Sequence, residues 1–279
     1  VNPDVLILAE HYGDPGEWLQ GDQWDSVMNY DAFMEPLTWF LTGMEKHSNE
    51  RRTDLWGNAE IFVNSMKHFM ACMLTPSLQV AMNELSNHDH SRFLTRTNHI
   101  AGRVEQLGYK AAEEGINEAV FCEAVAVQMT WVGAPTVYYG DEVGVVGFTD
   151  PDNRRTFPWG NENQRLLNFH KEMIRIHKEQ EILRTGSIKM LTWANNVLAY
   201  GRFQDDEQIV VILNNSKELK EITVPVWLAE VPQNTRMYRL MYTYEEGFTT
   251  EYDEYIVQDG EVVVNMGRHS VLILKTLKE

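Results

Sequence analysis

Ionisable side chains follow two short apolar runs in the first ninety residues. Glu10 ends the run of "ILAEHYGD" (residues 7–14), and His88 and Asp89 stand in "ELSNHDHS" (residues 84–91). Apolar and aromatic neighbours disfavour the charged form of a carboxyl group, so we expect a raised pKa for Glu10 and a capacity to act as a general acid. Asp89 has polar neighbours and is expected to stay ionised. Two carboxyl groups that differ in this way predict cleavage of a glycosidic bond.

The elements that position these groups alternate between strands and helices. We predict strands within Val5–Ala9, Asp25–Tyr30, Val80–Asp89 and Thr136–Glu142, the last with its exit loop. Such alternation predicts an α/β fold with a parallel sheet. Active-site groups gather at the carboxyl ends of parallel strands, where Glu10 and the residues around His88 would lie.

The segments between the predicted strands have helical patterns, whereas the last third of the chain has the pattern of short strands. We predict helices near residues 58–73, 110–130 and 164–183; in the last, Leu166, Phe169, Met173 and Ile176 have helical spacing. After Gly186 the chain consists of short β-type runs between turn signals, and Gln258–Glu261 (QDGE) is a hairpin signal. The final ~90 residues therefore predict a small antiparallel β domain.

Composition excludes several classes of partner. The formal net charge of the 279 residues is −17, which argues against nucleic-acid or anionic-membrane partners, since both select positive surface. No apolar run approaches the ~20 residues that span a bilayer. Cys72 and Cys122 are too few and too far apart to predict a disulfide framework or a zinc site. We predict no cofactor, whereas a calcium requirement stays open, because the acidic residues show no oxygen-ligand loop pattern from which it could be read.

Taken together, these motifs resemble the α-amylase family of retaining α-glucan hydrolases. "ILAEHYGD" is similar to the family's strand-5 motif, "LSNHDHSRFLT" to its strand-7 motif, and "GAPTVYYGDEVGVVG" to its strand-8 stretch. "GDQWDSVMNYD" and "DPDNRR" add a likeness to neopullulanases, cyclomaltodextrinases and maltogenic amylases. The resemblance implies strands 5–8 of a (β/α)8 TIM barrel in residues 1–187, followed by a small antiparallel β-sandwich in residues 188–279.

The resemblance also implies roles for individual residues. Glu10 would be the general acid/base, and Asp89 would hydrogen-bond sugar hydroxyls and stabilise an oxocarbenium-like transition state. Arg92 would anchor the strand-7 loop. The remaining implied substrate contacts are His88, Asn87, Tyr12, Asn29, Asp150 and Arg154. The substrate would be an α-glucan oligosaccharide of the starch type or a cyclodextrin.

One part of the family pattern has no counterpart in this sequence. The nucleophilic Asp at the end of strand 4, with Arg two residues before it, is not found, nor is the Asn-His pair of strand 3. Arg52-x-Asp54 has the right spacing but belongs to a loop before a helix. We therefore expect the chain to be the C-terminal part of a longer or two-chain enzyme. Its partner would be the N-terminal half, without which we expect no meaningful turnover.

Other functions fit part of the same pattern. A non-catalytic glucan-binding or partner module would retain His88 and Asp89, although it would have no use for Glu10. A transglycosylase, sucrose-type transferase or isomerase of the same family is a further alternative, which analysis of the products would separate from a hydrolase. The sequence leaves open the compartment, the oligomeric state and the preference among α-1,4, α-1,6 and cyclic substrates.

Overall fold

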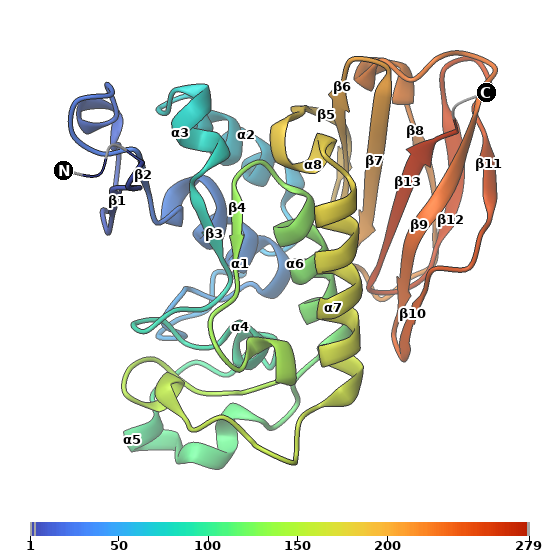
Figure 1. Ribbon diagram of the computed structural model, residues 1–279. Helices are drawn as coiled ribbons and strands as arrows, with labels where there is room; N and C mark the ends of the chain where they lie inside the picture. Colours follow the sequence, from blue (N-terminus) through green and yellow to red (C-terminus); the bar gives the residue numbers. More distant parts are fainter. Residues whose placement is uncertain (1, 3, 278–279) are drawn as a thin grey trace.

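The computed structural model describes residue 2 and residues 4–277, and it places helices and short parallel strands beside a large antiparallel sheet (Figure 1). β1 (Leu8–Ala9) pairs in parallel with β2 (Ser26–Val27), and β3 (Met82–Glu84) pairs in parallel with β4 (Ala134–Thr136). A parallel bridge from Met28 to Met82 links the two pairs. The predicted parallel pairing is therefore confirmed, although each strand is shorter than expected.

The prediction for the fourth strand was wrong in its position. β4 begins at Ala134 and ends at Thr136. The backbone N–H of Ala134 donates to the Ala81 carbonyl at 2.7 Å. Residues after Thr136 form the exit loop, which holds a short 3-10 turn at Asp141–Val143. Pro135 within β4 donates no ladder hydrogen bond, which is tolerated where a strand is paired on one side. The Gln128 side chain instead links the two strands, donating to the carbonyls of Asn83 and Thr136.

The helices lie mainly between the parallel strands and the antiparallel sheet (Figure 1). A single π-helical turn, Tyr30–Met34, leads into the first of them. The helices are α1 (Glu35–Thr42), α2 (Ala59–Met70), α3 (Thr75–Gln79), α4 (Phe93–Arg96), α5 (Val104–Leu107), α6 (Glu118–Thr130), α7 (Gln164–Glu179) and α8 (Ile182–Thr185).

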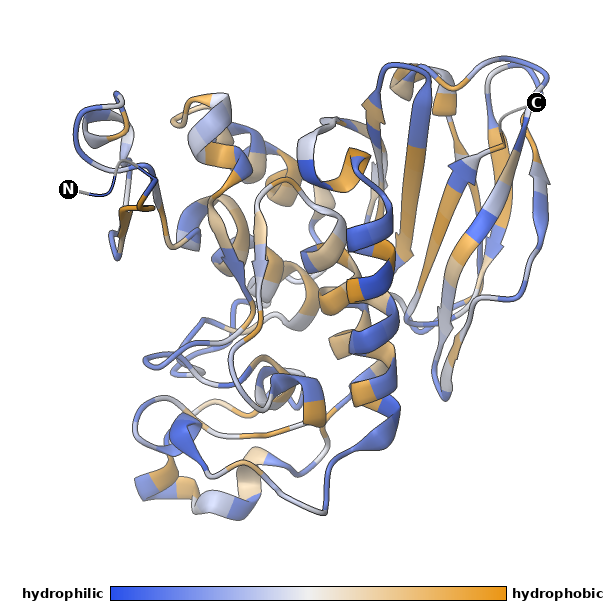
Figure 2. Cartoon of the chain, viewed as in Figure 1, coloured by the Kyte–Doolittle hydropathy of each residue, from blue (hydrophilic) through white to orange (hydrophobic). Residues whose placement is uncertain are grey.

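The helix predicted at residues 110–130 starts later than its Ala- and Glu-rich composition suggested. Asn117 caps α6, because its Oδ1 accepts hydrogen bonds from the N–H groups of Ala119 and Val120. Gly115, with a φ of +71°, breaks the segment before it. In α7 the four predicted core residues are all buried, and apolar and polar residues alternate along the helix (Figure 2).

The C-terminal part forms two antiparallel sheets among the described residues. The large sheet has the order β10-β9-β13-β7-β6-β5, with β11 also paired to β9, and β8 pairs with β12 in a second sheet. The bounds are β5 (Ser187–Ala194), β6 (Val197–Gln204), β7 (Glu207–Asn214), β8 (Lys220–Val224), β9 (Arg236–Tyr244), β10 (Gly247–Thr249), β11 (Glu254–Ile256), β12 (Val262–Met266) and β13 (Ser270–Thr276).

The hairpin predicted at Gln258–Glu261 is only half right. Gln258 and Glu261 form an antiparallel bridge, with positive φ at Asp259 and Gly260, as a tight hairpin turn requires. The strands on its two sides then diverge, because β11 pairs with β9 while β12 pairs with β8. The turn therefore carries the chain from one sheet to the other.

Two apolar layers hold the molecule together. One face of the large sheet, including Tyr200 and Val211, packs with residues of α2, α6 and α7 in one continuous core. The other face, including Val210 and Leu272, packs against β8 and β12. In the described part of the chain, no helix is long and apolar enough to cross a membrane.

Candidate active site

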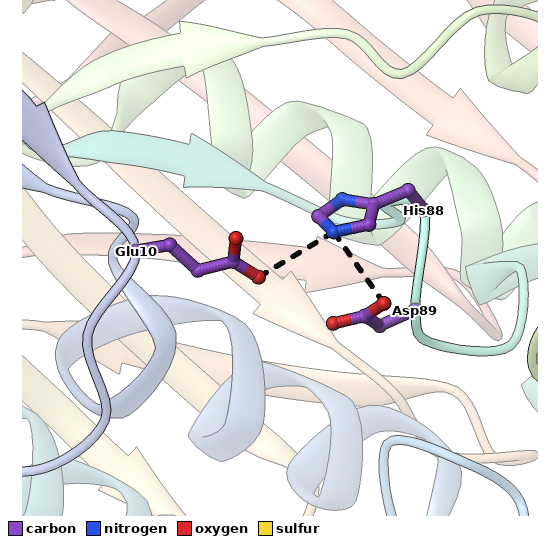
Figure 3. A group of neighbouring side chains, drawn as sticks. All are labelled: Glu10, His88 and Asp89. Carbon is purple, nitrogen blue, oxygen red and sulfur yellow. Dashed lines mark ion pairs between the residues drawn. The ribbon is translucent and has the colours of Figure 1, made fainter.

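Glu10, His88 and Asp89 meet at the carboxyl ends of β1 and β3 (Figure 3). The Nε2 atom of His88 lies 3.5 Å from Oε1 of Glu10 and 3.4 Å from Oδ1 of Asp89. One potential ligand atom from each residue lies within 4.8 Å of the others. Residues almost eighty positions apart in sequence thus form one cluster, as their positions after predicted strands indicated.

The cluster is open to solvent. Glu10, His88 and Asp89 expose 44%, 43% and 39% of their side chains. Glu10 is therefore not enclosed as expected. The His11 ring packs against Trp18, 4.7 Å between centroids, and aromatic rings border Glu10 on one side only. A half-exposed cluster can receive a polar substrate directly.

Asn87 and Asn29 follow β3 and β2 and are both buried. The Oδ1 atom of Asn87 accepts hydrogen bonds from the N–H groups of Asp89 (3.0 Å) and His90 (2.9 Å), so it shapes the loop that presents Asp89. Asn87 is 3% exposed and Asn29 is 2% exposed, and the Asn29 amide donates to Oδ1 of Asn83 at 2.7 Å. Both side chains are buried, so neither is placed for the direct substrate contact that the resemblance implied. Asn87 instead shapes the loop that presents Asp89, and Asn29 bonds to Asn83.

Tyr12 and Tyr30 form an aromatic wall beside Glu10. Their rings are stacked, with centroids 4.5 Å apart, and Tyr12 is 48% exposed while Tyr30 is buried. The Tyr30 hydroxyl lies 3.4 Å from Oε1 of Glu10. Nζ of Lys46 lies 4.5 Å from the centroid of the Tyr12 ring. Tyr12 is therefore placed where a sugar ring could contact it. Tyr30, which the sequence placed at the end of a strand but without a role in the site, is a direct neighbour of Glu10.

A hydrogen-bonded chain links this wall to a buried carboxyl group. The Asn87 amide donates to Oε1 of Glu84 at 2.7 Å and approaches the Tyr30 hydroxyl at 3.3 Å. Burial raises the pKa of Glu84 to about 8, which the Asn87 hydrogen bond offsets only in part. Glu84 was missed because a single Glu in a strand-like run gives no sign of which face it occupies.

His90 closes the chain of contacts on the other side of Tyr12. Its Nε2 atom lies 3.2 Å from the Tyr12 hydroxyl. Burial, and then the charge of Arg96, lower the pKa of His90 to about 2. His90 is therefore neutral at ordinary pH and serves as a hydrogen-bonding support for Tyr12. Its position two residues after His88 was the one signal that could have found it.

Asp150 and Arg154 lie on the loop after β4, next to the His88 loop. Nε of Arg154 lies 2.7 Å from Oδ1 of Asp150 and donates to the His88 carbonyl at 3.1 Å. The N–H of Asp150 donates to the Asp89 carbonyl. Both side chains are about half exposed, so they extend the cluster along its rim. By contrast, Asp54 does not join the cluster, since it lines a separate hollow.

The same three central side chains define which groups could hold a cation. Glu10, His88 and Asp89 supply carboxylate and imidazole atoms within 4.8 Å, which are ligand types that divalent metals accept. Exposed acidic groups commonly occur without a metal. The arrangement is equally suited to proton transfer and to hydrogen bonding of hydroxyl groups.

Two carboxyl groups at the carboxyl ends of parallel strands suit the cleavage of a glycosidic bond, and comparisons with known proteins identify the family. Residues 1–181 match the family profile "Alpha amylase, catalytic domain", so the chain belongs to the α-amylase family of glycoside hydrolases. It is 36% identical over 234 residues to Neopullulanase 2 of Thermoactinomyces vulgaris, and the match covers 81% of this chain. It is 35% identical over 222 residues to a cyclomaltodextrinase of Thermoanaerobacter pseudethanolicus, covering 79% of this chain.

A solved structure supports the same placement. A debranching enzyme from Nostoc punctiforme superposes with a TM-score of 0.75 at 25% identity, over 98% of this chain and 52% of that one. The matched regions make up 34% of both curated relatives, so the chain spans about a third of their length. The predicted family and its neopullulanase-like character are confirmed.

The titration of Glu84 yields a prediction about stability. A buried carboxyl group with a pKa near 8 keeps its proton between about pH 4.5 and pH 8, where the unfolded chain has lost it. Its contribution to folding therefore weakens as pH rises, by about 1.4 kcal/mol per pH unit in this window. Glu84→Gln keeps an acceptor for Asn87 and never ionises. Urea unfolding at pH 5 and pH 8 should show the variant gaining stability relative to the parent as pH rises.

A matched control removes an exposed carboxyl group instead of a buried one. Glu113 is exposed, so Glu113→Gln should leave the pH dependence of unfolding unchanged. A parallel pH dependence in the parent and in Glu84→Gln would show that Glu84 does not titrate in this way.

Proposed function

We propose that this chain carries the general acid/base and the substrate-binding pair of a retaining α-glucan hydrolase. The observation that carries the proposal is the convergence of Glu10, His88 and Asp89 within 4.8 Å at the ends of two parallel strands. Family membership and relatives named neopullulanase and cyclomaltodextrinase support an α-glucan substrate. The proposed substrates are starch-type oligosaccharides, pullulan or cyclodextrins.

In the proposed reaction, Glu10 gives its proton to the glycosidic oxygen as the bond to the anomeric carbon breaks. A carboxylate nucleophile attacks the anomeric carbon and forms a covalent glycosyl-enzyme. Glu10, now ionised, removes a proton from water, which displaces the nucleophile and restores the acid. Asp89 would hydrogen-bond sugar hydroxyls and stabilise positive charge at the ring. His88 contacts both carboxylates and would donate to the same sugar.

The nucleophile is proposed to come from outside these residues. Retaining glycosidases place their two carboxyl groups roughly 5–5.5 Å apart. Asp89 is close enough to Glu10, but its assigned role is sugar binding, and no Arg-x-Asp stretch of the described chain reaches the cluster. We propose that β1–β4 are strands 5–8 of a (β/α)8 barrel whose other half supplies the nucleophile. Residues 1–187 would then be barrel and residues 188–279 an all-β domain.

The test follows the stereochemistry of the products. The intact protein, which is this chain together with the proposed N-terminal half, is incubated with maltoheptaose, β-cyclodextrin and pullulan. The anomeric protons of the products are followed by ¹H NMR from the first minutes. Initial release of the α-anomer is expected. Initial β-anomer would exclude the retaining mechanism, and binding without any hydrolysis would favour the non-catalytic module. Because it lacks the proposed nucleophile, the 279-residue chain alone should turn over at least about a thousandfold more slowly than the enzyme with its N-terminal half. Full activity of the chain alone would exclude a nucleophile from outside it.

A further inference from the structure

A hollow that is separate from the Glu10 cluster is lined by two exposed tryptophans. It has a volume of about 450 Å³ and lies between the loop that precedes α2 and the end of β5. Trp56 is 40% exposed and Trp193 is 43% exposed. In Figure 1, β3 and β4 lie between β5 and β1, and β1 is the strand that precedes Glu10. The residues lining the hollow are Asp54, Trp56, Asn58, Ala59, Glu60, Trp193, Ala194 and Asn195.

Each ring has contacts with residues that do not line the hollow. The Trp56 ring packs on His99, with centroids 4.5 Å apart, and its inner side lies so close to Gly43 that a Cβ there would approach to 2.9 Å. Nζ of Lys67 lies over the Trp193 ring at 5.3 Å from its centroid. The Trp56 ring therefore keeps its position without a ligand, which reduces the entropy lost on binding.

The two walls of the hollow are also joined to each other. The N–H of Asn196 donates to the Gly57 carbonyl at 2.8 Å, and the N–H of Asn215 donates to the Asn196 carbonyl at 2.8 Å. The Asn215 amide reaches across to the Leu41 carbonyl at 3.0 Å. These bonds fix the turn after β5 against the loop before α2, so the hollow is a preformed feature of the fold.

The lining combines flat apolar rings with oxygen-rich side chains. Indole rings offer large apolar faces, and the C–H faces of a sugar ring can stack on them. Asp54, Glu60 and Asn195 supply carboxylate and amide groups that can bond to hydroxyl groups. The carboxylates disfavour an anionic ligand, and so does a net charge of −17. A neutral polyhydroxylated chain fits all of these features.

From these features, we infer that the hollow bounded by Trp56 and Trp193 is a second α-glucan-binding site, which holds a polymer while the Glu10 cluster acts elsewhere on it. The choice of α-glucan rests on the proposed function, whereas the choice of a neutral sugar chain rests on the hollow itself. Occupation of both sites by one polymer would raise its apparent affinity without changing the handling of short oligosaccharides.

The experiment measures retardation of the intact protein in native gels that contain amylopectin. Glu10→Gln serves as the background, so that the polymer is not consumed. Trp193→Ala in this background is expected to weaken apparent amylopectin affinity about fivefold, the loss of one aromatic contact. Trp227→Ala is the matched control, because Trp227 is 55% exposed but does not line the hollow. Trp193→Phe should retain most of the retardation. Gels with hydroxyethyl cellulose test whether the retardation is specific to α-glucans.

Hydrolysis of maltotriose by the proteins without the Glu10 change separates the two proposals. Normal hydrolysis, with retardation reduced in Trp193→Ala but not in Trp227→Ala, supports both the catalytic proposal and the second site. Normal hydrolysis with unchanged retardation in Trp193→Ala, or with no retardation of the parent, overturns the second site and leaves the proposed function standing. Trp193-dependent retardation without hydrolysis supports the hollow and overturns the catalytic proposal. Neither retardation nor hydrolysis overturns both.

Discussion

Glu10→Gln in the intact protein is expected to lower kcat on maltodextrins about a thousandfold or more, because general acid–base catalysis of this kind contributes factors up to about 10⁴. The substitution is nearly isosteric. The amide oxygen can still accept from the Tyr30 hydroxyl, which lies 3.4 Å from Oε1 of Glu10. Geometry is therefore retained while the transferable proton is lost, so KM should change much less than kcat.

Two further measurements identify the missing step. α-Maltosyl fluoride needs little protonation of its leaving group, so the variant should still form the glycosyl-enzyme from it. Azide needs no general base, and it should restore turnover and give α-maltosyl azide. Glu17→Gln is the control, because Glu17 is an exposed glutamate near the same strand. Near-parental kcat in Glu10→Gln, or a loss that azide does not relieve, would exclude the acid/base role.

The sequence predicted the centre of this site better than its support. Glu10, His88 and Asp89 could be found because polar residues directly after apolar runs lie at strand ends, and parallel strands bring those ends together. Tyr30 and Glu84 are buried, and their side-chain directions depend on contacts from elements far away in sequence. Asn87 shows the same limit, since its amide points inward to Glu84 although it lies beside His88.

The fold shows a similar division between local and non-local information. The amphipathic period of α7 predicted its buried face, because the helical repeat follows from sequence alone. The turn at Asp259-Gly260 was predicted from local chemistry, yet the partners of its flanking strands were not, because β11 and β12 belong to different sheets. The start of α6 depends on the Asn117 cap, which composition over a window conceals.

Arg92 ties the two loops of the candidate site together from below. It is fully buried, and its Nη1 lies 2.9 Å from Oδ1 of Asp141. The same guanidinium donates to the carbonyls of Tyr139 (2.7 Å) and Asn153 (2.8 Å). It also lies over the Tyr138 ring, 4.1 Å from the centroid. The loop after β3 is thereby fixed to the loop after β4, as the anchor role implied by the sequence requires.

Arg92→Met is expected to lower the free energy of unfolding by about 3–5 kcal/mol, because it leaves the Asp141 carboxylate buried without its partner. Arg175→Met is the control: Arg175 is 47% exposed and pairs with Glu172, so its loss should cost about 1 kcal/mol or less. Both are measured by urea unfolding of the intact protein.

A double variant distinguishes a lost ion pair from a lost packing contact. Arg92→Met combined with Asp141→Asn removes both charges, so it should be more stable than the two separate losses predict when they are added. Strict additivity would mean that the carboxylate contributes nothing to the defect. If the anchor also positions the site, the double variant should regain stability without regaining kcat/KM, because the bonds to the Tyr139 and Asn153 carbonyls stay absent. Parental kcat/KM in Arg92→Met would instead show that His88 and Asp89 hold their geometry without this anchor.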